Sequence, residues 1–127
     1  MAFHQAPFRI LAHNGRNWYI LHLGDGRVQL DFGPFAVAFP REAFQLIHGL
    51  VEAAVSEPTV PGCMAHAGVE RSVWFDPQHG TILLVFEGMI LRFLPHEAVA
   101  FVSLCREAGN RLGVNPTPPP STFSGLN

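Results

Sequence analysis

Lysine is absent from this chain of 127 residues: all eight basic residues are arginine, and the formal net charge is −2. Proteins that bind duplex DNA usually present a basic face, so this charge balance argues against that class. Charged residues are also scarce, at 14 % against 48 % apolar residues. Such a composition excludes a chain that is disordered over most of its length and predicts a single domain with a substantial core.

Cysteines and long apolar runs are equally rare. Cys63 and Cys105 are the two cysteines, fewer than a small secreted domain held by disulfides usually carries. No apolar run approaches the length of a membrane span, and the chain does not begin with the basic and apolar regions of a signal peptide. We therefore expect a cytoplasmic protein with no membrane partner.

Catalytic and cofactor motifs are missing as well. The serines lie in no GxSxG elbow, and the chain has neither a phosphate-binding Walker loop nor a GxGxxG sequence. No nucleophile, base and orienting group can be assembled from the sequence. We expect no enzyme, no catalytic residues and no cofactor.

The seven histidines raise the question of a metal site. His13 and His66 occupy matching positions in the sequences LAHNG and MAHAG, and Cys63 lies close to His66. Zinc needs three or four converging ligands, and no CxxC or HExxH motif is present. We favour an Ala-His-x-Gly strand-to-turn element inherited twice, with no metal. A His-based metal site or enzyme built on His13, His66 and Cys63 is the alternative.

The strongest positive signal is an internal duplication. Residues 26–53 and 80–108 match: Gly26, Leu30, Phe32 and Phe39 correspond to Gly80, Leu84, Phe86 and Phe93 at a constant offset. One inserted residue then aligns Pro40 and Glu42 with Pro95 and Glu97. A repeat of this kind is the first feature from which the fold is derived. The inserted residue does not weaken the match, because loops of duplicated units tolerate small changes in length.

Each repeat predicts several strands followed by one helix. Alternating apolar residues bounded by Asn-Gly, Asp-Gly and Gly-Pro turns indicate strands, and a proline followed by an apolar stripe indicates a helix. In the first repeat, about 8–55, the strands are 8–13, 17–23, 27–32 and 35–39, and the helix starts at Pro40. In the second, about 63–110, they are 63–66, 71–76, 81–86 and 89–93, and the helix runs from 95 to about 108, where Gly109-Asn110 is expected to stop it. Residues 56–62 read as a linker and the Pro- and Ser-rich residues 115–127 as a flexible tail.

The fold class is therefore α+β: two tandem repeats of three to four antiparallel strands plus one helix, sharing one core in a single domain. The expected inner face consists of the pairs Val28/Ile82, Leu30/Leu84, Phe32/Phe86, Phe35/Met89, Val37/Leu91 and Phe39/Phe93. A helix pressed on that face is the simplest way to cover it.

The outer faces of the two repeats differ. Gln29, Asp31, Ala36 and Ala38 of the first repeat are replaced by Leu83, Val85, Ile90 and Arg92 in the second. A sheet that is wet on one side should not be apolar there. We expect Leu83, Val85 and Ile90 to be covered, by the other repeat, by the tail or, as we favour, by a second copy in a homodimer. A non-enzymatic interaction or oligomerisation domain is the leading hypothesis.

Aromatic residues suggest an alternative function. Trp18, Ile20 and Trp74 are expected on the outer strand faces, with Arg27 and Arg92 near them in sequence. Aromatic rings with arginine neighbours can stack unpaired bases, so single-stranded nucleic-acid binding through Trp18, Arg27, Trp74 and Arg92 is a second hypothesis. The same tryptophans could instead pack under the tail or across a dimer.

The layout also resembles a known architecture. Two β-β-β-β-α units of about fifty residues, with Asp25-Gly26-Arg27-Val28-Gln29-Leu30 between an aromatic strand and a hairpin, are similar to PUR repeats and the related Whirly-like fold. The second copy has Gly80-Thr81-Ile82, without the arginine. The resemblance implies a protein that binds single-stranded nucleic acid on its sheet or that dimerises.

Overall fold

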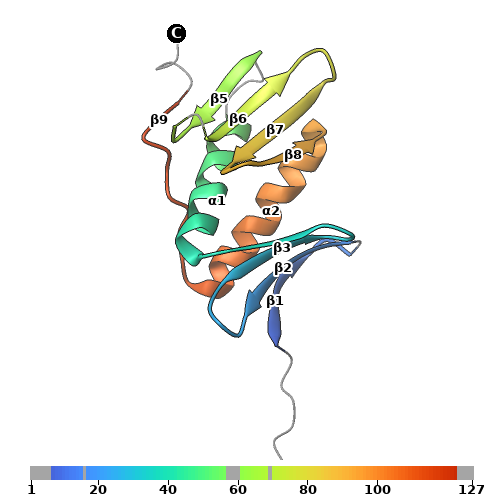
Figure 1. Ribbon diagram of the computed structural model, residues 1–127, viewed down its shortest axis with the longest axis vertical. Helices are drawn as coiled ribbons and strands as arrows, with labels where there is room; N and C mark the ends of the chain where they lie inside the picture. Colours follow the sequence, from blue (N-terminus) through green and yellow to red (C-terminus); the bar gives the residue numbers. More distant parts are fainter. Residues whose placement is uncertain (1–6, 16, 57–60, 69, 123–127) are drawn as a thin grey trace, which may run out of the picture.

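Two antiparallel sheets enclose two helices in the computed structural model, which describes residues 7–15, 17–56, 61–68 and 70–122 (Figure 1). The first sheet has the order β1-β2-β3-β4 and the second the order β8-β7-β6-β5-β9. The first unit consists of β1 (Phe8–His13), β2 (Trp18–Leu23), β3 (Val28–Phe32), β4 (Ala36–Phe39) and α1 (Arg41–Val55). The second consists of β5 (Gly62–His66), β6 (Arg71–Asp76), β7 (Thr81–Phe86), β8 (Met89–Phe93) and α2 (Pro95–Leu112), followed by β9 (Ser121–Thr122). The two-unit α+β architecture predicted from the repeat is confirmed.

Each helix covers the sheet of the other unit. Helix α2 packs mainly against β1 and β2, α1 packs mainly against β5 and β6, and the two helices contact each other. The exchange is visible in Figure 1, where both helices lie between the sheets. The ring of Phe101 in α2 lies 5.9 Å from that of Phe32 in β3. The two units therefore share one core, and neither sheet is covered by its own helix alone.

The helix starts follow from local chemistry, whereas the end of α2 differs from the prediction. Pro40 precedes the first residue of α1 with an extended backbone, as suits a residue without an N–H donor. At the start of α2 the Glu97 carboxylate accepts the Leu94 N–H at 2.8 Å, which satisfies a backbone donor near the helix start. The expected stop at Gly109 is wrong, because α2 continues to Leu112 and ends at Gly113, whose φ of 73° is left-handed.

Gly109 instead permits a close approach. A methyl group at this position would lie 3.1 Å from the carbonyl oxygen of Val114 and close to the ring of His48. The absence of a side chain there lets the chain fold back as soon as α2 ends, a role that a local sequence pattern cannot distinguish from that of a helix stop.

The segment after α2 differs from the loose tail that its composition predicts. The Thr117 N–H donates to the carbonyl of Gln45 in α1 at 2.9 Å, and the Gln45 side-chain amide donates to the carbonyl of Asn115 at 2.8 Å. Strand β9 then pairs with β5. Residues 115–122 thus form a strap that begins along α1 and ends at the edge of the second sheet. Residues 123–127 lie outside the described residues, as do positions 57–60 of the expected linker.

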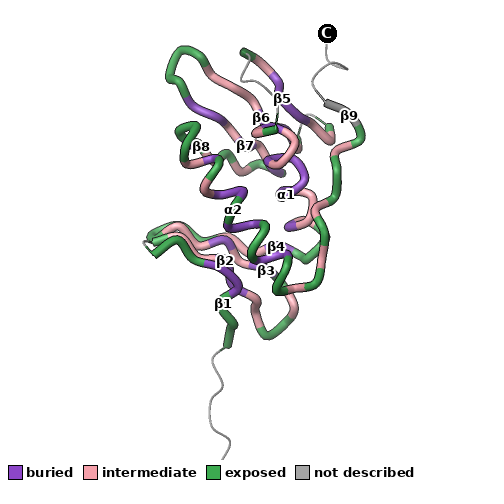
Figure 2. Tube along the Cα trace, turned by 180° about the vertical axis from the view of Figure 1, so that it is seen from behind, coloured by how far each residue is buried: buried purple, intermediate pink, exposed green. Residues whose placement is uncertain are grey.

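The core occupies the inner faces of both sheets and the buried stripes of both helices (Figure 2). Of the six predicted inner-face pairs, Val28/Ile82, Leu30/Leu84 and Phe39/Phe93 are buried as expected. In the pair Phe32/Phe86, Phe86 is buried and Phe32 is half-buried. The pairs Phe35/Met89 and Val37/Leu91 are not buried, because the side chain of Phe35 is 42 % exposed and the other three are half-buried. They line the groove described below. Among the described residues no helix is long and apolar enough to cross a bilayer.

Candidate binding groove and apolar sheet face

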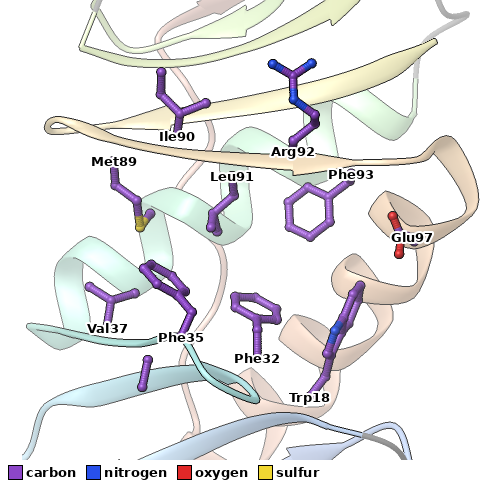
Figure 3. Close-up of a pocket in the computed structure, with 11 residues that line it drawn as sticks. Trp18, Phe32, Phe35, Val37, Met89, Ile90, Leu91, Arg92, Phe93 and Glu97 are labelled. Atoms are coloured by element: carbon purple, nitrogen blue, oxygen red, sulfur yellow. The ribbon is translucent and has the colours of Figure 1, made fainter. Parts of the chain in front are cut away.

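A groove with a volume of about 690 Å³ opens between the two sheets where β4 and β8 face each other (Figure 3). Side chains from both strands point into it from opposite sides, and α2 closes one end. It is lined by Trp18, Phe32, Phe35, Ala36, Val37, Met89, Ile90, Leu91, Arg92, Phe93 and Glu97. The volume and the apolar lining are those of a typical ligand-binding site.

Aromatic rings form one wall of the groove. Trp18 lies edge-to-face with Phe32, at 5.2 Å between ring centroids, and with Phe93, at 5.9 Å. Phe35 stacks on Phe32 at 6.4 Å. These separations are within the range of favourable aromatic contacts, so the wall is held in place by packing within the protein.

The expected outward orientation of Trp18 and Ile20 is wrong. In the ladder between β2 and β3, Trp18 pairs with Phe32 and Ile20 with Leu30, and directly paired residues share a face of the sheet. Both residues therefore face inward with Phe32 and Leu30. The two tryptophans are not equivalent either, because the residue paired with Phe86, the counterpart of Phe32, is Arg71.

The charged residues at the groove rim already have partners. The guanidinium of Arg92 donates to the Thr81 hydroxyl at 2.9 Å and to the Asp76 carboxylate at 3.4 Å. The hydrogen bond with His79 is the main cause that lowers the pKa of Asp76, so Asp76 is anionic at neutral pH. Glu97 holds the N–H of Leu94. Arg92 at the rim is therefore ion-paired, while Glu97 keeps its negative charge, and the interior between them is lined by apolar side chains.

The outer face of the second sheet carries the residues expected at a dimer interface. Ladder pairs place Leu83 beside Trp74 and Arg92, and Val85 beside Ile90. Ile90 is 62 % exposed, whereas Leu83 and Val85 are half-buried. Trp74 lies on this face and donates its indole N–H to the Ser72 hydroxyl at 2.7 Å. The structure thus brings Leu83, Val85 and Ile90 together on one surface.

The four residues proposed for nucleic-acid binding are not gathered on one face. Trp18 lies on the inner face of the first sheet, whereas Trp74 and Arg92 share the outer face of the second. Arg27 follows the turn after β2 and pairs with Asp25 at 2.8 Å. Trp74 and Arg92 both pair with Leu83, but Trp18 and Arg27 belong to the first unit.

The candidate metal ligands lie in separate sheets. His13 ends β1, where its Nδ1 accepts the Gly15 N–H at 3.1 Å and its ring stacks on Tyr19. Cys63 and His66 belong to β5. No group of three or more His, Cys, Asp or Glu side chains within the described parts of the chain is placed to hold a metal ion. Burial raises the pKa of both cysteine thiols, which keeps them protonated and weakly nucleophilic.

A polar network that runs from the buried His48 to the surface was not predicted. His48 of α1, 3 % exposed, lies 3.1 Å from the carboxylate of Glu52, which accepts two hydrogen bonds of 2.7 Å from Arg106 of α2. Burial lowers the pKa of His48, while the Arg106 guanidinium is the main cause that lowers that of Glu52. The i, i+4 spacing of His48 and Glu52 was visible in the sequence, but the partner helix that supplies Arg106 was not.

The sequence did not predict the groove, because its aromatic residues follow the same alternation as the buried ones.

Comparisons of the chain with protein-family models, with curated proteins and with solved structures find no match. The resemblance to PUR repeats therefore stays a prediction.

Proposed function

We propose that this protein is a non-enzymatic self-association domain, a homodimer in its simplest form, that assembles through the outer face of its second sheet. The observation that supports the proposal is the exposure of Ile90, 62 %, in an apolar row with Val85 and next to Leu83. We expect this assembly in the cytoplasm.

The position of Ile90 makes self-association physically reasonable. β8 is an edge strand of its sheet, and natural edge strands are usually protected by charge, proline or a covering segment. The single charged residue of β8, Arg92, is engaged by Asp76 and Thr81. An apolar patch without free charge can face its own copy across a twofold axis, since like charges are not brought together.

Burial of this patch would favour the dimer. Full burial of an exposed isoleucine side chain contributes about 1.5–3 kcal/mol; Ile90, 62 % exposed, gains the larger part of this, and a twofold contact uses it twice. Leu83 and Val85 add the remainder of their apolar surface. In a twofold dimer the same patch on each copy buries the patch of the other, so no second binding surface is needed. For this reason a second copy is favoured over an unrelated partner.

The test is the substitution Ile90→Arg, followed by light scattering coupled to gel filtration at micromolar concentration. We expect the unmodified protein to elute as a dimer and the variant as a monomer, because an arginine at the centre of the contact would be buried without a partner. Val99→Arg is the matched control: Val99 is 59 % exposed but belongs to α2 and not to the outer face of the second sheet. A monomeric unmodified protein, or dissociation by both substitutions alike, contradicts the proposal.

Single-stranded nucleic-acid binding stays a separate prediction. The net charge of −2 and the distribution of Trp18, Arg27, Trp74 and Arg92 over two sheets do not favour it. Titration of the tryptophan fluorescence with mixed-sequence oligonucleotides at low salt checks it, and absence of quenching removes it.

A further inference from the structure

We propose that the groove between β4 and β8 binds an extended peptide segment that is uncharged and carries large apolar side chains at alternate positions. The segment would add as a strand to the free edge of β8 and insert every second side chain into the groove. This function goes beyond self-association through the outer face and does not depend on it.

The first argument is the pattern of the lining. Every residue of β8, Met89–Phe93, borders the groove, although Ile90 and Arg92 point to the opposite side of the strand from Leu91 (Figure 3). A surface that touches only one face of a strand meets every second residue. Contact with consecutive residues is the pattern expected of a groove that runs along the edge of the strand, and β8 is an edge strand.

The backbone at that edge is available for pairing. In the part of the chain that the structure describes, β8 pairs with β7 on one side and with no strand on the other. An edge of this kind presents N–H and C=O groups to an incoming strand, and such main-chain bonds provide affinity in peptide recognition by strand addition. Pockets for alternate side chains then provide specificity.

The second argument is the chemistry of the interior. Phe35, Met89 and Leu91 offer apolar contact, and a volume of about 690 Å³ accommodates more than one large side chain. At the rim, Arg92 is ion-paired with Asp76, whereas Glu97 accepts one backbone N–H and keeps its charge. A charged side chain inserted among Phe35, Met89 and Leu91 would lose its water without gaining a partner, which is strongly unfavourable, so the side chains that enter the interior are uncharged.

The third argument comes from the internal duplication. A second, smaller groove lies at the start of α1 and is bordered by Glu42, Arg71 and Phe86. In the first unit and its groove, the counterparts of these three residues are Glu97, Trp18 and Phe32, in that order. There Arg71 lies over the ring of Phe86 and forms an ion pair with Glu87. The second unit therefore has a charged side chain at the position where Trp18 lines the first groove. The aromatic wall is a feature of the first groove and is not repeated in the second, as expected if it serves binding.

The experiment uses the full chain with Trp74→Phe, so that Trp18 in the groove wall is the single tryptophan. The probe is a blocked nine-residue peptide in which threonine alternates with leucine and phenylalanine. We expect a saturable shift of the Trp18 emission on titration. Phe35→Asp should weaken binding by roughly tenfold or more, because it places a carboxylate against the apolar segment. Ile10→Asp is the matched control, since Ile10 is 43 % exposed on the first sheet and Phe35 is 42 % exposed.

Strand addition itself is tested with two N-methylated versions of the peptide, each blocking alternate amides. A strand in a sheet directs successive N–H groups to opposite edges, so one version should lose at least about tenfold in affinity and the other should bind nearly as the parent. This comparison is made in the Trp74→Phe chain with Phe35 retained, so it does not depend on the folding of the Phe35→Asp variant. Equal behaviour of the two versions overturns the proposal, as does the absence of any shift.

The same titration separates this proposal from self-association. If a second copy fills the groove, the Trp18 emission will change with protein concentration in the absence of peptide, and the peptide will compete with it; this result also overturns the proposal. Loss of the dimer in Ile90→Arg with retained peptide binding by the unmodified protein would leave both proposals standing. Loss of one of them leaves the other intact.

Discussion

The exchange of helices predicts that the two repeats unfold together, and Phe101→Ala tests it. Phe101 belongs to α2 but is 0 % exposed, with its ring 5.9 Å from Phe32 in the first sheet and 5.2 Å from Phe93 in the second. Removing a buried phenylalanine side chain costs about 3–5 kcal/mol through lost burial and the cavity left behind. That is a large part of the roughly 5–15 kcal/mol that stabilises a natural domain.

The measurement is urea unfolding followed by circular dichroism, together with calorimetry. A loss of 1 kcal/mol lowers the thermal unfolding midpoint of a domain of this size by roughly 3–5 °C, so the calorimetric midpoint of Phe101→Ala should lie about 10–20 °C below that of the unmodified protein. Both proteins should show a single transition, because the residue connects the two sheets. Val99→Ala on the same helix, at a position 59 % exposed, should change stability by no more than about 0.5 kcal/mol. Two separate transitions, or a stable isolated first repeat, would refute the reasoning.

Two further predictions concern the strap and the buried histidine. Gly49→Ala should destabilise the protein by about 1–3 kcal/mol in urea unfolding, because a methyl group there would overlap the Thr117 carbonyl; Gly24→Ala, where the nearest atom lies at 3.6 Å, is the control, and equal effects would contradict a packed strap. Burial lowers the pKa of His48 in the folded state despite the opposing effect of Glu52, so the unfolded chain binds more protons and stability should fall as pH decreases through about 6.5. His48→Gln should flatten that part of the stability profile measured from pH 8 to pH 5, and an unchanged slope would show that another group is responsible.

The predicted strands agree closely with the structure because their signals are local. The alternation of Val28, Leu30 and Phe32 defines one face of a strand without reference to the rest of the chain. Turn residues at Asp25-Gly26 and Gly33-Pro34 then limit each strand to a few residues. The start of α2 was equally local, whereas its end at Gly113 was not, because Gly109 is used for a close contact with the returning chain.

The candidate sites were harder to predict. The sequence correctly predicted that Leu83, Val85 and Ile90 share the outer face, because alternate residues of a strand lie on the same side of a sheet. The orientation of Trp18 was missed, because a continuous run of large residues in β2 leaves both faces apolar. Its inward direction follows from the register with β3, which sets Trp18 opposite Phe32.

The sequence by itself determined two β-β-β-β-α units and the residues that share each strand face. Periodicity and turn chemistry act over a few residues, so these features can be read without the fold. The tertiary structure alone decided that α2 covers the first sheet and α1 the second, that Phe35 and Met89 remain at an open groove, and that residues 115–122 strap α1. The spacing of apolar residues along the sequence shows which side chains lie together on one surface. The surface that covers them is set by packing between segments far apart in the chain.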